Sequence, residues 1–290
     1  MRDATADGSG CQVCGGEVHP YRKGWLFRCG ACGVLSSSLD IAIPSEESEA
    51  GIDEAAREQG LATLRRDNNA LLLDRLAALA PAGGRLLDVG SGPGFLLAQA
   101  AAAGFAAEGI EPDANVHPDQ AGGAKVRRGF FPQVLEPGER FDVIVFNDVL
   151  EHIPDLAGAL AASFERLTPG GILCLNCPDK RGLFFRTAAA LDRLGVQGPY
   201  ARLWQRGLPS PHVWYFTPGL LDRAAGRAGF APVGRQRLAT IALKGLWSRI
   251  RLVRSTPLVL ALASYAFSVM IFPLLRLTPS DASASFYRRP

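Results

Sequence analysis

Acidic residues are nearly absent from the last fifth of the sequence, and an export signal is absent from its start. From Arg235 onward the chain has nine basic residues and one acid, Asp281, a net charge of +8, whereas residues 1–234 carry −5. A basic charge spread over the whole chain would indicate nucleic acid. Here it is local and borders an apolar stretch, which favours contact with a membrane surface. Residues 1–10 are polar, so we expect no signal peptide and a cytoplasmic protein, peripheral on the inner face of the membrane if it binds lipid.

Cysteine is scarce outside one short segment, because four of the six fall within residues 11–32. Without an export signal, this pattern indicates a metal site rather than disulfides. Two C-x2-C pairs, fourteen residues apart, come close to the four-cysteine zinc pattern. The expected ligands of a structural zinc ion are Cys11, Cys14, Cys29 and Cys32. So small a module needs the metal to fold, and contact with substrate or a partner is the alternative role. Cys174 and Cys177 are expected to pack on opposite faces of a strand.

The 290 residues are 48% hydrophobic and 20% charged, which suits one large domain with small appendages. No internal repeat is visible. We expect a zinc-ribbon-like module at 1–35, a linker at 36–51, the main domain at 52–240, a basic and apolar helical insertion at 241–278, and a last strand and tail at 279–290.

Strand and helix signals alternate through the main domain. The expected strands are 85–89, 105–110, 124–128, 141–146, 171–176, 231–238 and 283–288, and the expected helices include 52–80, 95–103, 155–167 and 217–230. This alternation predicts an α/β fold, a doubly wound, mostly parallel seven-stranded sheet with helices on both faces.

A glycine loop, "GSGPG", follows the first of these strands at residues 90–94. It lacks the third glycine of the dinucleotide fingerprint, because Phe95 stands there, and it lacks the Gly-Lys-Ser/Thr ending of a phosphate-binding loop. Asp88 before the loop would repel a pyrophosphate but suits a cationic ligand. Glu111, at the end of the second strand, suits two ribose hydroxyls. A nucleoside with positive charge and no phosphate fits these residues, and S-adenosylmethionine is such a molecule.

Five segments carry a resemblance to the class I S-adenosylmethionine-dependent methyltransferases over residues 52–238. They are "LLDVGSGPG", "GIEP", "FDVIVFNDVLEHIPD", "LTPGGILCLNCPD" and "SPHVWYFTPGLLDRAAGRAGF". The last is similar to the branch that contains the ubiquinone-type O-methyltransferases. The resemblance implies a Rossmann-like methyltransferase fold and a set of cofactor-binding residues: Asp88, Gly90, Ser91, Gly92 and Gly94 for the methionine portion, Glu111 for the ribose, Phe130 or Phe131 for adenine, and Asn147 beneath the cofactor.

Histidine is the natural general base for an oxygen acceptor, and the chain has only four. His19 lies in the cysteine module and His117 in a segment rich in proline and glycine, which leaves His152 and His212 as candidate bases. In the ubiquinone-type relatives, a carboxylate-x-x-Glu-His set is associated with magnesium. This chain has Asp148, Glu151 and His152 there, with Asp where those relatives carry Glu. The alternative is that Glu151 and His152 only hold the loop.

The apolar run 257–275 has no charged residue over nineteen positions. Its length just reaches that of a spanning helix, but Pro273 interrupts it, and a span would separate residues 283–288 from the sheet. The segment 243–254 mixes apolar and basic residues, as interfacial helices do. Three readings remain open for 243–276: a hairpin on a membrane or against a lipid-like substrate, a buried helix or oligomer contact, and a true span.

Three function classes follow. The first is a methyltransferase, in secondary or envelope metabolism, that O-methylates a small-molecule, sugar or lipid-like acceptor. The second is an RNA methyltransferase with a zinc module, disfavoured because residues 1–234 carry net −5. The third is a non-catalytic, cofactor-binding subunit. The sequence leaves the oligomeric state open.

Overall fold

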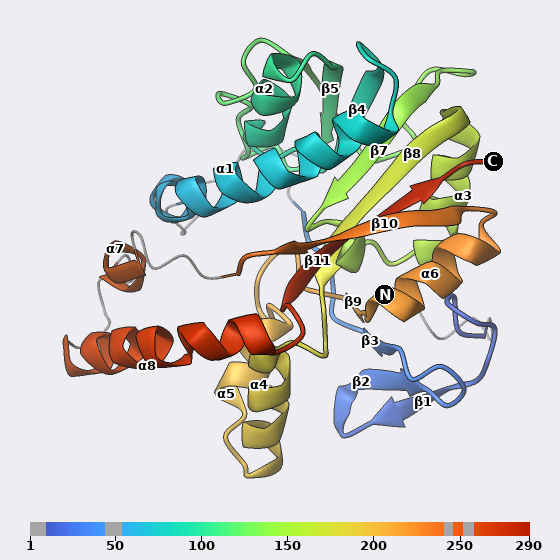
Figure 1. Cartoon of the computed structure of the whole chain (residues 1–290). Helices are drawn as coiled ribbons and strands as arrows, with labels where there is room; N and C mark the ends of the chain where they lie inside the picture. The colour runs from blue at the N-terminus through green and yellow to red at the C-terminus, as the bar shows by residue number, and fades with distance from the viewer. Residues whose placement is uncertain (1–9, 44–53, 241–245, 252–257) are drawn as a thin grey trace.

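The computed structural model of the protein describes residues 10–43, 54–240, 246–251 and 258–290 (Figure 1). Its central element is a seven-stranded sheet in the order β10-β11-β8-β7-β4-β5-β6. The strands are β4 (Arg85–Val89), β5 (Ala106–Glu111), β6 (Lys125–Arg128), β7 (Phe141–Asn147), β8 (Leu167–Pro178), β10 (Ala231–Leu238) and β11 (Ala282–Arg288). The five strands from β6 to β8 are parallel, and β11 runs antiparallel to both of its neighbours. This confirms the doubly wound, mostly parallel α/β fold and the seven expected strands.

Helices cover both faces of the sheet. Leucines of α1 (Glu54–Leu79) and α2 (Phe95–Ala102) share one buried cluster with the sheet, whereas α3 (Leu156–Arg166) and α6 (Pro218–Arg227) belong to the other. Cys174 lies in the first cluster and Cys177 in the second, which is the opposite-face packing that the strand predicts. Because β4, β5, β7 and β8 all run the same way, their carboxyl ends meet at one edge, where a doubly wound fold binds its ligands.

A second, four-stranded sheet joins the cysteine module to the main domain. Its order is β1-β2-β3-β9, with β1 (Val18–Tyr21), β2 (Lys23–Cys29), β3 (Leu35–Ser37) and β9 (Trp214–Tyr215). The expected linker at 36–51 therefore starts too early, because β3 runs through Ser37 and the next residues pack on the main domain. Ile41 contacts the buried cluster below the sheet. Residues 44–51 of that linker lie outside the described residues.

Five further helical segments complete the described residues: η1 (Leu150–His152), α4 (Leu183–Arg193), α5 (Gly198–Leu203) and the insertion helices α7 (Leu246–Arg251) and α8 (Leu258–Leu277). In the sequence, α8 comes after β10 and before β11. In Figure 1 it extends away from the sheet. Among the described residues, no helix has the length and apolarity that crossing a bilayer requires. The expected strand at 283–288 is β11, which lies inside the sheet between β8 and β10.

Candidate active site

One cavity of about 900 Å³ opens at the carboxyl edge of the parallel strands. Its lining falls into two halves. Gly90, Glu111, Phe130 and Phe131 form one half, and η1, α4, α5 and the segment before β9 form the other. A single cavity is thus lined by these four of the expected cofactor residues and by the expected catalytic residues Glu151, His152 and His212.

The glycine loop turns from β4 toward β5 immediately after the strand. The amides of Gly90 and Ser91 both donate to the carbonyl of Ile110, at 2.8 and 3.0 Å. Gly94 has φ +94°, and a Cβ there would lie 2.5 Å from the Cα of Ala121. Only glycine fits that position without strain, so the end of the loop is held close to the backbone at Ala121.

Glu111 stands at the end of β5 and binds the loop. Its carboxylate accepts from the amides of Gly92 at 2.8 Å and Asp113 at 2.9 Å. Burial raises the pKa of Glu111, and the two amides oppose that rise. Each carboxylate oxygen keeps a further lone pair, so the residue can still accept hydrogen bonds from a ribose diol.

Asp88 lies in β4, two residues before the loop begins at Gly90, and is 2% exposed. Burial raises the pKa of this carboxyl to about 8, and the charge of Glu111 adds to the rise. Its Oδ1 has no hydrogen-bond partner among the described residues. A buried acid without a partner at the loop suits a cationic ligand, as its place in the sequence predicts.

The aromatic residues after β6 line the cavity, whereas Asn147 does not. Phe130 is 57% exposed, and Phe131 packs edge-to-face on Phe146 with ring centroids 5.6 Å apart. The Asn147 side chain instead accepts from Asn176 at 2.8 Å and donates to Asn69 of α1 at 3.3 Å. It links β8 to α1 and is absent from the described cavity wall.

The two candidate histidines, sixty positions apart in the sequence, meet in the cavity. The rings of His152 and His212 pack edge-to-face with centroids 4.7 Å apart. Nδ1 of His152 lies 3.0 Å from the carbonyl oxygen of Pro211. Since a carbonyl only accepts, this contact favours the tautomer with the proton on Nδ1 and with Nε2 as the basic nitrogen, and the hydroxyl oxygen of Ser210 lies 3.2 Å from the same Nδ1. The amide nitrogen of Gln205 lies 2.9 Å from Nε2 of His212, and burial, together with the charge of His152, lowers the pKa of His212 to about 3.

Carboxyl groups complete this half of the site. Glu151 is 1% exposed. Among the described residues, neither of its carboxyl oxygens has a hydrogen-bond partner. Burial raises the pKa of Glu151 well above its usual range, and the charge of Asp148 adds to that rise. Burial also raises the pKa of Asp148 to about 6, opposed by Arg65. A carboxyl with a pKa of about 6 is mostly ionised at pH 7, so Asp148 supplies a negative charge beside Glu151.

The donor set at this cluster does not match the magnesium ion expected from the sequence. Ligand atoms of Glu151, His152 and His212 lie within 4.8 Å of one another, and Asp148 is not among them. Magnesium prefers six oxygen ligands, whereas two imidazoles and one carboxylate suit a transition metal. We therefore assign the cluster no role for magnesium.

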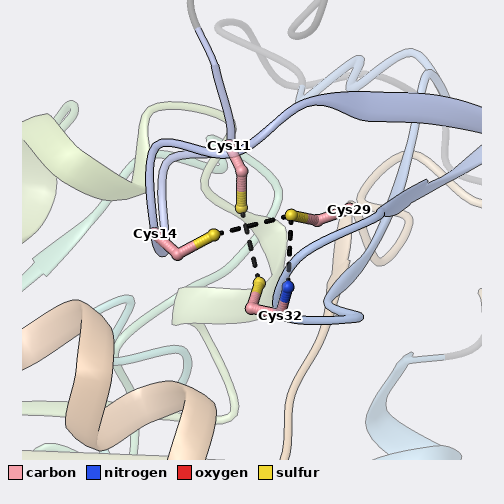
Figure 2. A group of neighbouring side chains, drawn as sticks. All are labelled: Cys11, Cys14, Cys29 and Cys32. Carbon is pink, nitrogen blue, oxygen red and sulfur yellow. Dashed lines mark hydrogen bonds between the residues drawn. The ribbon is translucent and has the colours of Figure 1, made fainter.

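The four cysteines of the module converge from two turns (Figure 2). Sγ of Cys11 lies 3.7 Å from Sγ of Cys32, and Sγ of Cys14 lies 3.5 Å from Sγ of Cys29. Four sulfurs at about 2.3 Å from a tetrahedral zinc ion are about 3.8 Å apart. The amides of Gly16 and Cys32 also point at Sγ of Cys14 and Cys29, at 3.4 and 3.5 Å. The donor set and its spacing fit zinc.

A family model described as "Methyltransferase domain" matches residues 61–234, more than half of the chain. The chain belongs to this family. Its methyltransferase domain is similar to proteins named ubiquinone biosynthesis O-methyltransferase. That of Azorhizobium caulinodans is 30% identical over 56% of this chain and 65% of its own length, and that of Ruegeria pomeroyi is 32% identical over 58% and 68%. Over a shorter stretch, 30% of this chain and 37% of the relative, the Paramagnetospirillum magneticum protein is 43% identical. The chain thus spans about a third to two thirds of the length of these relatives.

Solved structures share the fold of this methyltransferase. An S-adenosylmethionine-dependent methyltransferase of Mesorhizobium loti has a TM-score of 0.51 and 19% identity, covering 77% of this chain and all of its own. Phosphoethanolamine N-methyltransferase 2 of Haemonchus contortus, solved with S-adenosylmethionine, has a TM-score of 0.51 and 15% identity over 81% of this chain and 55% of its own. At such identities the likeness shows the fold alone.

Several cavity residues carry no sequence signal that names them as site residues. Ile41 and Ile43 come from the expected linker, Arg65 from α1, and Phe185 and Tyr215 from segments outside the cofactor motifs. Only the three-dimensional path of the chain brings them to the cavity. Asp148, whose backbone is left-handed at φ +59°, does sit beside the recognisable Glu-His pair.

Proposed function

We propose that this methyltransferase transfers the methyl group of S-adenosylmethionine to an oxygen of a small-molecule, sugar or lipid-like acceptor. One observation carries the proposal: a single cavity joins the glycine loop and Glu111 to a buried carboxyl and two imidazoles. The names of the ubiquinone-type relatives support an oxygen acceptor. A largely apolar and aromatic wall, with Ile153, Phe185 and Tyr215, favours an acceptor with an apolar or aromatic body.

In the proposed mechanism the acceptor hydroxyl gives its proton to Nε2 of His152. The oxygen lone pair forms a bond to the methyl carbon as the carbon–sulfur bond breaks, and its electron pair goes to sulfur. The products are a methyl ether and S-adenosylhomocysteine, and the imidazolium returns its proton to solvent. The Nδ1–H of His152, held by the carbonyl of Pro211 at 3.0 Å, fixes the tautomer that this step needs. Positioning in the cavity supplies much of the rate.

His212 and Glu151 support His152 in this proposal. His212 remains neutral because it is buried, and it packs against the ring of His152. Glu151 is held in its neutral form by burial, and a neutral carboxyl donates a hydrogen bond to an acceptor oxygen. Both residues orient the acceptor and the base.

Two further proposals concern the ends of the chain. The four cysteines would hold a structural zinc ion that supplies a fixed cross-link between the two turns of the module. The insertion would bind an anionic lipid surface from the cytoplasmic side. The described part of α8 exposes Val259 (80%), Met270 (67%) and Leu262 (52%), and the segment from Arg235 onward carries +8. Apolar area with clustered positive charge is the composition of an interfacial helix pair.

The lipid contact is tested by vesicle flotation with and without anionic lipid. We expect binding to vesicles rich in phosphatidylserine, weakened by salt, and weakened at least tenfold in the double variant Leu262→Glu with Met270→Glu. Leu194→Glu is the matched control, because Leu194 is also exposed (80%) but lies at the end of α4. Protein that ignores the vesicles would refute the contact, and a change of mass on light scattering in the double variant would instead assign the face to a second copy.

The acceptor is tested by a substrate search. The purified protein is incubated with host extract and a cofactor that carries a deuterated methyl group, and the aqueous, organic and RNA fractions are analysed by mass spectrometry. We expect the label as a methyl ether on a small molecule or lipid. Label confined to RNA would replace the proposal with an RNA methyltransferase. Cofactor binding without any transferred label would replace it with a non-catalytic subunit.

A further inference from the structure

Several contacts among the described residues fasten the cysteine module to the acceptor half of the site. Gln12 bridges the carbonyl of Pro154 and the amide of Ala157, at 3.1 and 3.0 Å. Lys23 forms an ion pair of 2.8 Å with the buried carboxylate of Asp192 on α4. The Trp25 and Trp204 rings pack with centroids 5.7 Å apart, and β3 pairs with β9. Pro154, α4, Trp204 and β9 all border the acceptor half.

The β3 contact leads directly to the catalytic cluster. The amide of Ser37 donates to the carbonyl of Val213 at 2.9 Å, and the amide of Val213 donates to the carbonyl of Glu151 at 2.7 Å. The hydroxyl of Ser37 donates to the carbonyl of His212 at 2.9 Å, and all the atoms of this bond are buried. The backbone of β3 is therefore one residue away from Glu151 and one hydrogen bond away from His212.

The segment after β3 reaches the cavity itself. Ile41 and Ile43 line it, and between them the amide of Ala42 donates to the carbonyl of Pro209 at 2.8 Å. Within the described residues 10–43, the hydrogen bonds and ion pairs to the rest of the chain reach neither the glycine loop nor Glu111. The polar attachments of the module thus lie on the acceptor side, whereas its buried Val13 and Val34 belong to the apolar cluster below the sheet.

We propose that the cysteine module is the positioning element of the acceptor site, with Ser37 holding His212 and with Ile41 and Ile43 contacting the acceptor. The proposal rests on the proposed function. A two-residue strand such as β9 does not stay in place alone. Without β3 the buried carbonyls of His212 and Val213 would each lose a donor, which is costly. The module therefore fixes the distance between His212 and His152, the proposed base, and does not change the affinity of the cofactor half for S-adenosylmethionine.

Three variants of the full-length protein test this: Ser37→Ala, Ser37→Thr, which keeps the hydroxyl, and Ile41→Ala. Glu17→Ala is the matched control in the same module, since its side chain is 91% exposed. Each is measured for S-adenosylmethionine affinity by calorimetry, for deuterated methyl transferred to host extract, and for diethylpyrocarbonate modification at His212 by peptide mass spectrometry. His117, which is exposed and lies outside the module, is the internal reference for that reagent.

We expect cofactor affinity within twofold of the wild type in all variants. In the Ser37→Ala variant we expect the reagent to modify His212 faster. We also expect methyl transfer to fall about threefold to tenfold, the effect of one buried hydrogen bond. Ser37→Thr is expected to restore both rates. Ile41→Ala is expected to change which extract molecules carry the label. Removal of the metal by a chelator is expected to lower transfer more than Ser37→Ala does, again at unchanged cofactor affinity.

Unchanged transfer and unchanged His212 modification in Ser37→Ala and in the chelated protein would overturn the proposal. Cofactor affinity that falls together with transfer would also overturn it, because the module would then support the whole domain. Both outcomes differ from failure of the proposed function, in which the wild type itself transfers no label.

Discussion

Binding of S-adenosylmethionine is expected to remove a proton from Asp88. Burial raises the pKa of this carboxyl to about 8, and the charge of Glu111 adds to the rise, so about nine-tenths of the unliganded protein carries the protonated form at pH 7. The ammonium and sulfonium charges of the cofactor favour the ionised form. Binding at pH 7 should therefore release about 0.9 proton.

The size of the effect follows from the ionised fraction of Asp88. With a pKa of about 8, that fraction rises from about 1% at pH 6 to about 24% at pH 7.5, and cofactor affinity should rise about 25-fold over the same interval. The α-amino group of the cofactor stays mostly protonated there. Because the pKa of folded Asp88 lies above its ordinary value of 3.8, its ionisation opposes folding as pH rises from about 4 to 8, and the cofactor should raise Tm more at pH 8 than at pH 6.

Isothermal titration calorimetry in buffers of different ionisation enthalpy measures both the affinity and the released proton. Asp88→Asn, a neutral residue of the same shape, should lose this pH dependence and bind the cofactor more weakly than the wild type at both pH values, with a wild-type advantage about 25-fold larger at pH 7.5 than at pH 6. Glu165→Gln on the exposed face of α3 is the control. Wild-type affinity that does not vary between pH 6 and 7.5, or a variant that keeps the pH dependence, would refute the reasoning.

Three further predictions use the same site and the module. Gly94→Ala should lower the free energy of unfolding by about 2 to 5 kcal/mol, because its Cβ would press on Ala121. Gly92→Ala, which has open space around the new Cβ, should lower it by only about 1 to 2 kcal/mol. Equal losses for the two variants in denaturant titrations would contradict the close contact at Gly94. Since the pKa of His212 is lowered to about 3, it is neutral down to about pH 4, and pH–rate profiles of His212→Gln and the wild type should share the same acid limb; a shifted limb would make His212 the titrating base. Elemental analysis should find one zinc ion per chain and almost none in Cys14→Ser; zinc retained by that variant would disprove the four-cysteine site.

The sheet was predictable because each strand carries its own local signal. Short apolar runs end at glycine or proline, and six of the seven strands begin and end within one residue of their expected bounds. The exception is β8, which starts at Leu167 and not at 171, because pairing of Leu167 with Phe141 of β7 extends it back through the turn. Tertiary pairing of this kind leaves no mark in the local sequence.

The meeting of Glu111 with the glycine loop was predictable for a related reason, since parallel strands bring their carboxyl ends to one edge. Glu111 and the glycine loop meet there as their offsets predict. The wall of the acceptor half was not predictable. Ile41 lies in a segment that reads as a polar linker, and only the pairing of β3 with β9 carries it to the cavity. The expected place of Asn147 beneath the cofactor stays a prediction, and its side chain instead joins α1 to β8.

The central claim is that methyl transfer takes place in the cavity with His152 as the base. Its most direct measurement is the amount of deuterated methyl transferred to host extract by the wild type and by the double variant His152→Ala with His212→Ala, at cofactor concentrations that saturate both. The account predicts many turnovers for the wild type and a loss of at least about 100-fold in the variant, the usual contribution of a general base, with cofactor affinity unchanged. Equal transfer by the two proteins would contradict it.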